Sequence, residues 1–458
     1  MRGGKSDKMN MNLRKQFLAA ACVYLGQSIV GYCIGWTAPV IQKLQNADET
    51  PLDAVLTDPE AALVGSIFFV GTTIGPYIAG YVSNVLGRRI CLFSAGVTTV
   101  ISLLMLALAK NVALIYVGRV FGGMGTSVIF IMSLVYVGEI ASTGIRGILL
   151  TLVGLSGSFG TLLVYSYGPF VSYAATCWLP LAMAVVYLCL LYTIPESPVY
   201  QVMVGKSDEA AATLISLGRE NDVDTVLATA NEKETKNNLS LFTDMYRVKA
   251  NRMALFLLIT LNVLQQMSGF YSMILFATNI FDMSGSSMES HISTIILGVT
   301  QLVSSLAAPF FIENVGRRPL LLMSTAISTI SLTTLATYFY LYETEHPVAD
   351  KLSWLSLTSL IVYFLAYTIG LGVIPNTLSG EMFTSNVRSI GTSVSLTVSW
   401  IVGFGVSTAF GYMIPAWGAA ITFWIYSGAC AVAFIFSVIF VPETKGKTLL
   451  EIQDMLNK

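Results

Sequence analysis

Long apolar runs without charge recur along the whole chain. Each is long enough for a helix that crosses a bilayer, which takes about 20 residues. Two runs are about twice that length, since 49 uncharged residues separate Arg146 from Glu196 and 54 separate Arg388 from Glu443. We expect these two runs to fold back, at Gly168-Pro169 and at Pro415. The pattern predicts twelve transmembrane helices, at 16–42, 61–87, 90–109, 111–138, two within 147–195, 253–281, 290–312, 319–342, 352–380 and two within 389–442.

A polar segment divides these helices into two sets of six. Residues 196–252 hold 16 charged residues in 57, whereas the whole chain holds 51 in 458. This composition indicates a soluble linker with short amphipathic helices, such as one over 208–217. The expected organisation is an N-terminal segment at 1–15, a six-helix bundle at 16–195, the linker at 196–252, a second six-helix bundle at 253–442 and a tail at 443–458.

The composition agrees with a protein that lies mostly in lipid. Apolar residues make up 54% of the chain and charged residues 11%, whereas soluble domains carry roughly 25% charged residues. A soluble enzyme and a disordered chain are therefore excluded, and the net charge of -1 argues against a nucleic-acid partner. We recognise no nucleophile, metal cluster or phosphate loop, so no enzyme activity, metal, cofactor or obligate protein partner is predicted.

The basic residues indicate the orientation in the membrane. Positively charged loops stay in the cytoplasm, and 21 of the 25 Lys and Arg residues fall on the side that carries both termini and the linker. We therefore expect a multi-pass protein of the plasma membrane with both termini in the cytoplasm.

Three charged motifs at the expected cytoplasmic helix ends occur once in each half: Gly-Glu with Arg seven residues after the Glu, Gly-Arg-Arg, and Pro-Glu-Ser or Pro-Glu-Thr. Two halves in the same orientation are typical of transporters with parallel repeats. We expect the carboxylates and guanidiniums to pair between neighbouring helices and to separate when the inner side opens. The alternative is ordinary interfacial charge that only fixes topology. The residues are Glu139, Arg146, Arg88, Arg89 and Glu196 in the first half and Glu381, Arg388, Arg317, Arg318 and Glu443 in the second.

At these residues the chain resembles the sugar porter family of the major facilitator superfamily, which includes facilitative glucose and insect trehalose transporters. Further matches are Gly118-Arg119, Pro195 to Pro198, Gln265-Gln266 with Ser268-Gly269, Glu313 before Gly316-Arg317-Arg318, and Pro442 to Gly446. The resemblance implies an all-α major facilitator fold of twelve helices in two pseudo-symmetric halves, alternating access, and a saccharide site lined mostly by the C-terminal half. It also implies that Glu313 belongs to the charge network.

Carried over by position, the resemblance implies that Gln265, Gln266, Gln301 and Trp400 contact the sugar. Several positions depart from the family. Gly154 stands where a helix 5 Gln is usual, Tyr271 replaces a helix 7 Asn, Leu275 and Phe276 replace an aromatic gating pair, and Asn376 stands where helix 10 has a Trp. Asn84 and Val85 likewise stand where Asp and Arg are usual. The pocket is therefore remodelled, and glucose is not assumed as the solute.

The polar residues within the predicted helices point to the same kind of solute without the family. Amides supply donors and acceptors for hydroxyl groups, and flat rings cover the apolar face of a sugar. The candidate substrate-binding residues are Gln265, Gln266, Gln301, Asn376, Trp400, Tyr271 and Gln27. The alternative for each amide is a hydrogen bond that only joins helices. Helix 10 has a further feature, because Gly372 and Pro375 mark a break that we expect to act as a hinge.

The placement of the acids bears on energy coupling. All 26 acidic residues fall in loops or near a helix end, and Cys33 occupies the position that resembles the acidic site of sugar-proton symporters. Arg119 is the one cation inside a predicted helix; it either orients the cavity or has a structural role. The sequence therefore predicts facilitative transport of a sugar, with trehalose or a hexose as the solute. The alternatives are a proton-coupled sugar symporter and a transport-incompetent sugar sensor, against which the short tail argues.

Overall fold

The computed structural model describes residues 3–223, 225–226, 245, 247–286, 288–383, 387–447 and 449–457. These residues form helices and no strand. The first half consists of α1 (Gly3–Gly35), α2 (Thr37–Gln45), α3 (Asp58–Ser66), α4 (Phe68–Val85), α5 (Arg88–Ala107), α6 (Val112–Ile140), α7 (Arg146–Tyr167), η1 (Gly168–Phe170) and α8 (Tyr173–Leu191). The linker contains α9 (Pro198–Met203), α10 (Ser207–Ser216) and η2 (Glu220–Asp222). The second half consists of α13 (Lys249–Met267), α14 (Phe270–Leu275), α15 (Ala277–Met283), α16 (Ser290–Val315), α17 (Arg317–Glu343), η4 (Asp350–Leu352), α18 (Trp354–Ile369), α19 (Ile374–Met382) and α20 (Arg388–Phe440), followed by α21 (Leu449–Asn457).

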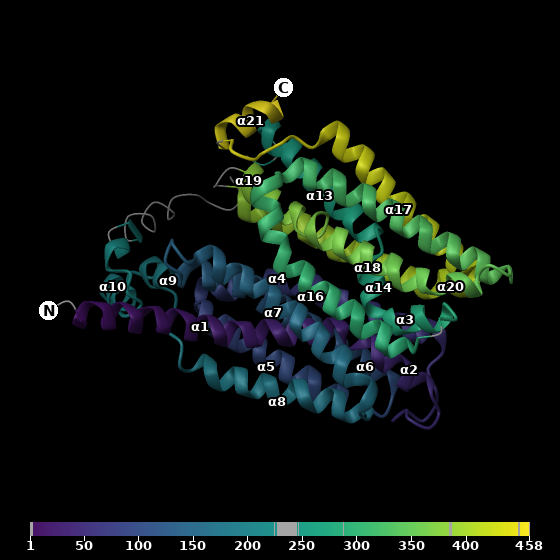
Figure 1. Ribbon diagram of the computed structural model, residues 1–458. Helices are drawn as coiled ribbons and strands as arrows, with labels where there is room; N and C mark the ends of the chain where they lie inside the picture. The colour runs from purple at the N-terminus through teal and green to yellow at the C-terminus, as the bar shows by residue number, and fades with distance from the viewer. Residues whose placement is uncertain are drawn as a thin grey trace.

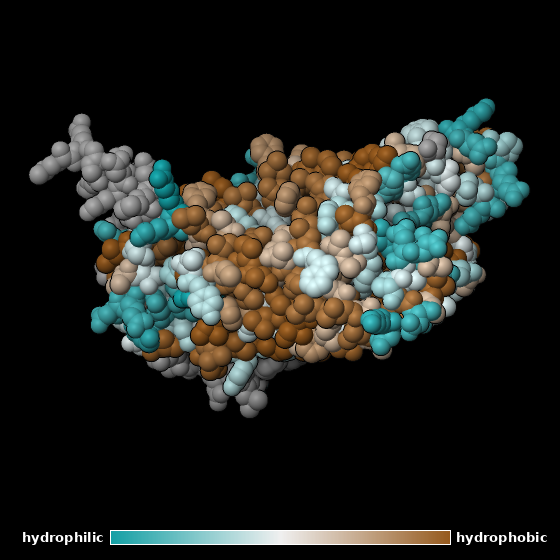
Figure 2. Space-filling model, turned by 90° about the horizontal axis from the view of Figure 1, so that it is seen from below, coloured by the Kyte–Doolittle hydropathy of each residue, from teal (hydrophilic) through white to brown (hydrophobic). Residues whose placement is uncertain are grey.

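The helical segments are long and apolar enough to cross a membrane many times. Within the described ranges, eleven segments meet this criterion, and the last one extends over 51 residues. That segment contains a break at Gly418, which divides it into two crossings and makes the structure consistent with the twelve predicted helices. On the face seen in Figure 2, apolar residues form a broad belt between two polar ends, as expected for a multi-pass membrane protein.

The position of the last turn differs from the prediction. Pro415 lies inside α20, and the chain reverses at Gly418, where φ is 84°. A positive φ is accessible to glycine at no steric cost. The side chain of Glu343 at the end of α17 accepts the N–H of Ala419 at 2.6 Å, so it caps the helix that begins after the turn. The other predicted reversal is confirmed, because η1 separates α7 from α8 at Gly168 and Pro169.

The two halves lie side by side and meet at one end of the molecule (Figure 1). We call the end that carries α10, α21 and the start of α1 the terminal face, and the opposite end, with α2, α3 and α15, the distal face. Near the distal face, Thr408 of α20 donates to the Ser66 hydroxyl at 2.7 Å, and Gln42 of α2 donates to Asp282 of α15. Near the middle of the helices, Tyr77 shares a hydrogen bond of 2.8 Å with Thr397, and Ser158 one of 2.6 Å with Ser305. The ribbons diverge only beyond these contacts, towards the terminal face, so the structure is closed at the distal face (Figure 1).

Candidate functional site

A cavity of about 320 Å³ lies between the two halves, near the middle of the apolar belt. The first half lines it with apolar and hydroxyl side chains: Val30, Ile34, Phe68, Phe69, Thr72, Thr126, Ser127, Phe130, Ile131 and Ser158, together with Gly154. The second half lines it mostly with amides and aromatic rings: Asn262, Gln265, Gln266, Gln301 and Asn376, and Phe270, Tyr271, Tyr367 and Trp400. Among the described residues that line this cavity, none is ionisable at neutral pH.

Gln265 and Gln266 are held at the end of α13 by hydrogen bonds in two directions. The side-chain nitrogen of Gln265 donates to the carbonyls of Leu371 and Gly372, at 2.9 and 3.1 Å. The side-chain nitrogen of Gln266 donates to the Ser399 hydroxyl at 2.9 Å. Adjacent helical residues diverge by about 100°, which explains why the two amides reach different helices. In both residues the amide nitrogen is fixed by protein, which leaves the carbonyl oxygen as the acceptor for a solute hydroxyl.

Three aromatic side chains pack together on one wall of the cavity. The rings of Phe69 and Trp400 are stacked, with centroids 5.7 Å apart and an interplanar angle of 16°. Tyr271 lies against both, at 5.4 Å from Phe69 and 5.6 Å from Trp400. Phe69 belongs to α4, whereas the other two belong to the second half, so this cluster joins the halves. The sequence does not single out Phe69, because one Phe among many in an apolar helix carries no distinguishing signal.

Two further predicted amides, Gln301 and Asn376, also line the cavity. The side-chain oxygen of Gln301 is buried and has no hydrogen-bond partner in the described part of the chain, and the same holds for the Thr368 hydroxyl. Asn376 is exposed to the cavity at the start of α19. Asn262 lines the cavity as well, and its position three residues before Gln265 places both on one face of α13, a spacing visible in the sequence.

Gln27 is not among the residues that line the cavity. It is buried, with 3% of its surface exposed, and its amide lies beside Gly157 of α7. Its side-chain oxygen is buried and has no hydrogen-bond partner among the residues that the structure describes. Gly154, one turn earlier on α7, does line the cavity, and a Cβ atom added there would have no heavy atom within 4 Å. Because glycine has no side chain, Gly154 leaves open space in the cavity at this position.

A break in the helices opposite Gln265 shapes one side of the cavity. Helix α18 ends at Ile369 and α19 begins at Ile374. The hydroxyl of Ser324 on α17 accepts the N–H of Leu371 at 2.9 Å and donates to the Ala366 carbonyl at 2.7 Å, so it satisfies backbone groups that the interruption leaves free. Pro375 lies in the first turn of α19, where its missing N–H is not needed. The break thus precedes Pro375 and extends over residues 370–373, including Gly372.

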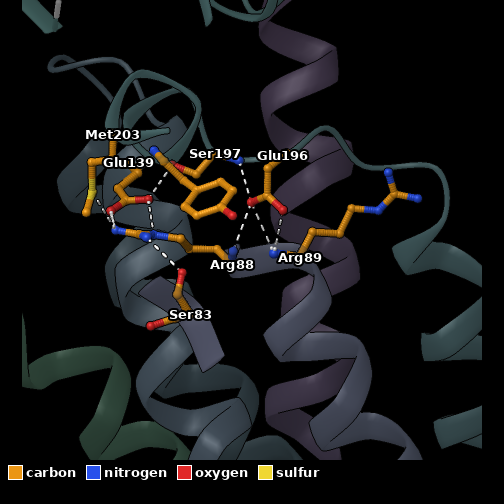
Figure 3. A network of polar contacts seen from close by, with 8 residues as sticks. Ser83, Arg88, Arg89, Glu139, Glu196, Ser197 and Met203 are labelled. Carbon is orange, nitrogen blue, oxygen red and sulfur yellow. Dashed lines mark hydrogen bonds and ion pairs between the residues drawn. The ribbon is translucent and has the colours of Figure 1, made fainter. Parts of the chain in front are cut away.

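Charged side chains form a cluster at the terminal face of the first half (Figure 3). The guanidinium of Arg88 on α5 makes two hydrogen bonds, each 3.1 Å, to the Glu139 carboxylate at the end of α6. Ser197 also donates to Glu139. The backbone N–H groups of Arg88 and Arg89 donate to the Glu196 carboxylate at 3.0 to 3.2 Å, at the N-terminus of α5. An anion at this position is favoured by the helix dipole.

The second half repeats this arrangement at the terminal face. Arg317 of α17 donates twice to the Glu381 carboxylate of α19, at 3.0 and 2.7 Å. Thr444 donates to the same carboxylate at 2.5 Å. The Glu443 carboxylate accepts the backbone N–H groups of Arg317 and Arg318 at 3.1 and 3.0 Å. Burial opposes the ionisation of Glu443, but these bonds and the Lys445 N–H outweigh it, and the pKa of the carboxyl is lowered.

The ion pairs of the two clusters lie within the halves and not between them. Both observed Arg-Glu pairs join helices of the same half, Arg88 with Glu139 and Arg317 with Glu381. Their expected separation when the inner side opens stays a prediction. No described hydrogen bond or ion pair joins one cluster to the other. Arg146 donates to the Ala141 carbonyl at 3.4 Å, and Glu313 is exposed at the end of α16. The side chain of Arg388 lies outside the described residues.

Arg119 is surrounded by hydrogen-bond acceptors of neighbouring helices. Its side chain is buried and donates to the carbonyls of Cys33 and Val64, at 2.8 and 3.1 Å, and to the Thr37 hydroxyl at 3.0 Å. The guanidinium also lies 4.5 Å from the centre of the Phe68 ring. It is absent from the cavity lining, and no carboxylate contacts it in the part of the chain that the structure describes. It joins α1, α3 and α6, which supports the structural alternative.

Comparisons with known proteins show the family of this chain. The sequence model of the family "Sugar (and other) transporter" matches residues 19–456. The facilitated trehalose transporter Tret1 of Culex quinquefasciatus is 30% identical over 443 residues, which cover 96% of this chain and 85% of that protein. Tret1 of Aedes aegypti is also 30% identical over 443 residues, which cover 96% of this chain and 54% of that protein. Tret1 of Drosophila pseudoobscura pseudoobscura is 31% identical over 447 residues, covering 96% and 51%. The chain thus spans about half the length of the last two relatives.

Solved structures with the same fold are sugar transporters. The proton:xylose symporter XylE bound to 6-bromo-6-deoxy-D-glucose is 24% identical and has a TM-score of 0.78, with coverage of 97% of this chain and 100% of that chain. XylE from E. coli in its inward open conformation is 24% identical and has a TM-score of 0.80, with coverage of 96% and 99%. At this level of identity the likeness shows the major facilitator fold alone. With the family match over nearly its whole length, this chain is a member of the Sugar (and other) transporter family.

Proposed function

We propose that this chain carries a sugar across the membrane by alternating access, as a facilitative carrier, with trehalose or a hexose as the solute. The observation that carries the proposal is the lining of the central cavity. Amides and aromatic rings face a space without ionisable side chains among its described lining residues. Such a lining suits an uncharged solute with many hydroxyl groups, because amides donate and accept while flat rings cover the apolar sugar face.

The proposal also covers the orientation of the chain in the membrane and the membrane in which it lies. The terminal face carries most of the basic residues, so the positive-inside rule supports a cytoplasmic terminal face. In that orientation the structure corresponds to the state closed to the outside. We place the carrier in the plasma membrane, and its partners are the saccharide and the lipid bilayer.

Gln265 links the solute to the moving parts in this proposal. Its amide nitrogen is committed to the carbonyls of Leu371 and Gly372 in the helix break, whereas its oxygen remains for a solute hydroxyl. A solute that binds to this amide therefore acts on the break between α18 and α19. The duplicated charge clusters hold each half together as a rigid unit while the halves rock. This role is supported by the location of both pairs within a half, where each joins two helices of the same bundle.

Counterflow uptake in proteoliposomes tests the proposed function. The vesicles are loaded with an unlabelled sugar and the entry of labelled trehalose, glucose and xylose is measured in turn. We expect accelerated uptake of at least one sugar, and a loss of about tenfold in Gln265→Ala, because a buried polar contact to the solute is removed. Gln27→Ala is the matched control, since it removes an equally buried amide outside the cavity. Equal uptake by wild type and Gln265→Ala would contradict the site.

A pH gradient separates facilitative transport from proton symport. One of the structural neighbours is named as a proton:xylose symporter, so the alternative has a specific basis. In this chain, Cys33 offers no carboxylate to carry a proton, and its backbone carbonyl accepts from Arg119. We expect that an inward proton gradient leaves the final sugar level equal on both sides. Accumulation of sugar above the outside concentration would overturn facilitative transport in favour of the symporter.

A further inference from the structure

A second cavity lies at the terminal face, away from the sugar site. Its volume is about 470 Å³, and it is bounded by the start of α13, the end of α20 and α21. The lining residues are Lys249, Arg252, Met253, Phe256, Leu257, Phe440, Pro442, Met455 and Leu456. Helix α21 packs on α13 and also contacts α19. The groove therefore sits where the apolar belt meets the polar end of the bundle.

The deep part of the groove is apolar and open to the membrane. Phe256 and Phe440 are 50% and 43% exposed, although they lie in segments that cross the membrane. Their ring centroids are 6.4 Å apart, and Phe436 lies 5.0 Å from Phe440 in the same group. Exposed rings at this depth offer a surface for a hydrocarbon chain.

The mouth of the groove is basic. Lys249, Arg252 and Phe256 follow one another at intervals of three and four residues, so they share one face of α13. The guanidinium of Arg252 is exposed and has no hydrogen-bond or ion-pair partner within the described ranges. Along this face, positive charge thus changes to aromatic surface within about two turns. That order matches a molecule with an anionic head and a hydrocarbon tail.

We propose that this groove binds an anionic phospholipid from the leaflet that borders the terminal face. The lipid phosphate lies at Arg252, and an acyl chain lies along Phe256 and Phe440. Basic pockets beside transmembrane helices bind anionic headgroups in this way. Because α21 closes the groove and contacts α19, an occupied groove fastens the tail to the helix that carries Asn376 and Glu381. This inference is independent of the sugar assigned to the central cavity.

Native mass spectrometry of the purified full chain tests the proposal. The protein is titrated in detergent with dioleoyl phosphatidylserine or with dioleoyl phosphatidylcholine, and bound lipid is counted. We expect one phosphatidylserine to bind preferentially and its apparent affinity to fall about fivefold in Arg252→Gln, which is the contribution of one basic residue. Arg247→Gln is the matched control. It removes the same charge from an exposed residue five positions earlier that does not line the groove.

A charge-conserving variant and a melting temperature distinguish the loss of lipid binding from the loss of the fold. Arg252→Lys keeps the charge and is expected to bind phosphatidylserine within about twofold of wild type, because Lys and Arg attract an anionic headgroup by the same charge. The melting temperature without added lipid shows whether each variant is folded. Equal binding of the two lipids, or an equal loss in Arg247→Gln and Arg252→Gln, would overturn the proposal. Displacement of phosphatidylserine by an equal concentration of inorganic phosphate would assign the site to free phosphate instead.

Discussion

The two halves share their charge clusters at the terminal face but differ in what they contribute to the cavity. In each half, a carboxylate binds the side chain of the first Arg of a Gly-Arg-Arg motif, and a second carboxylate caps the helix that this motif begins. The cavity lining does not repeat in this way, because all five amides among its described residues come from the second half. The two halves therefore agree in the residues of the charge clusters and differ in the residues that line the cavity.

The clusters themselves differ in depth. The side chains of Arg88 and Glu139 are 8% and 16% exposed, whereas those of Arg317 and Glu381 are 20% and 25% exposed. Arg88 also donates to the Ser83 carbonyl, and its guanidinium lies 5.5 Å from the centre of the Tyr200 ring on α9. The linker thus covers the first cluster, and equivalent mutations in the two halves need not have equal effects.

The largest expected effect follows from this difference in depth. Arg88→Ala leaves the Glu139 carboxylate buried without its cation, and we expect the free energy of unfolding to fall by about 3 kcal/mol. Arg317→Ala is expected to cost about half as much, because water reaches the remaining carboxylate more easily. Denaturant unfolding of both variants in the same detergent measures the difference. Equal losses would show that depth does not distinguish the clusters.

A double substitution checks the cause. In Arg88→Ala with Glu139→Gln no buried charge remains unpaired, so we expect part of the lost stability to return. If the double variant is less stable than Arg88→Ala by the full cost of a second independent mutation, the loss does not arise from an unpaired charge.

The next effect compares Gly154, which lines the cavity in the first half, with Gly370 in the helix break of the second half. A Cβ atom at Gly370 would lie 2.1 Å from the Cβ of Ser324, whereas one at Gly154 would meet nothing within 4 Å. We expect Gly370→Ala to destabilise the protein by about 2 kcal/mol and to slow transport, because overpacking displaces Ser324 from the helix break. Gly154→Ala is the control and is expected to stay within about 0.5 kcal/mol of wild type.

Substitution of Pro375 tests whether this proline or the preceding break over 370–373 acts as the hinge. Because Pro375 lies in the first turn of α19, we expect Pro375→Ala to change the transport rate by less than about threefold. If Pro375→Ala changes the transport rate more than Gly370→Ala does, the hinge lies at Pro375. Unchanged transport in both variants would remove the hinge from this segment.

A smaller effect concerns the cavity walls. Gln266→Leu removes an amide of the second half, and we expect the transport efficiency to fall about fivefold, as for the loss of one hydrogen bond. Ser127→Ala removes a hydroxyl of the first half, which already donates to the Met124 carbonyl, and is expected to change the efficiency less than twofold. Equal losses in the two variants would show that both halves contact the solute equally.

The sequence predicts those features whose residues are rare in this chain. Charged residues are scarce in this chain, so the duplicated motifs and the six-helix halves stand out in the sequence alone. The sequence does not indicate which guanidinium meets Glu139, because that depends on how α5 and α6 pack. Six of the seven predicted binding residues line the cavity, whereas Gln27 does not, since the face that a helix turns inward is decided by its neighbours. The predicted helix at 253–281 is interrupted at Gly269, where φ is 79°, so that α13 ends at Met267 and α14 begins at Phe270. The absence of charge over 253–281 does not indicate this interruption.

The smallest expected effect is a pH dependence of the second cluster. The pKa of the Glu443 carboxyl is lowered in the folded protein because the backbone N–H groups of Lys445, Arg317 and Arg318 outweigh its burial. A lowered pKa adds stability above the carboxyl's ordinary pKa, and that stability is lost as the pH falls through the folded value. We expect Glu443→Gln to unfold more easily than wild type at pH 7, by less than about 1 kcal/mol since the group is partly exposed, and this difference to shrink as the pH falls below the carboxyl's ordinary pKa. A constant difference between pH 7 and pH 3 would mean that the charge of Glu443 does not hold the start of α17.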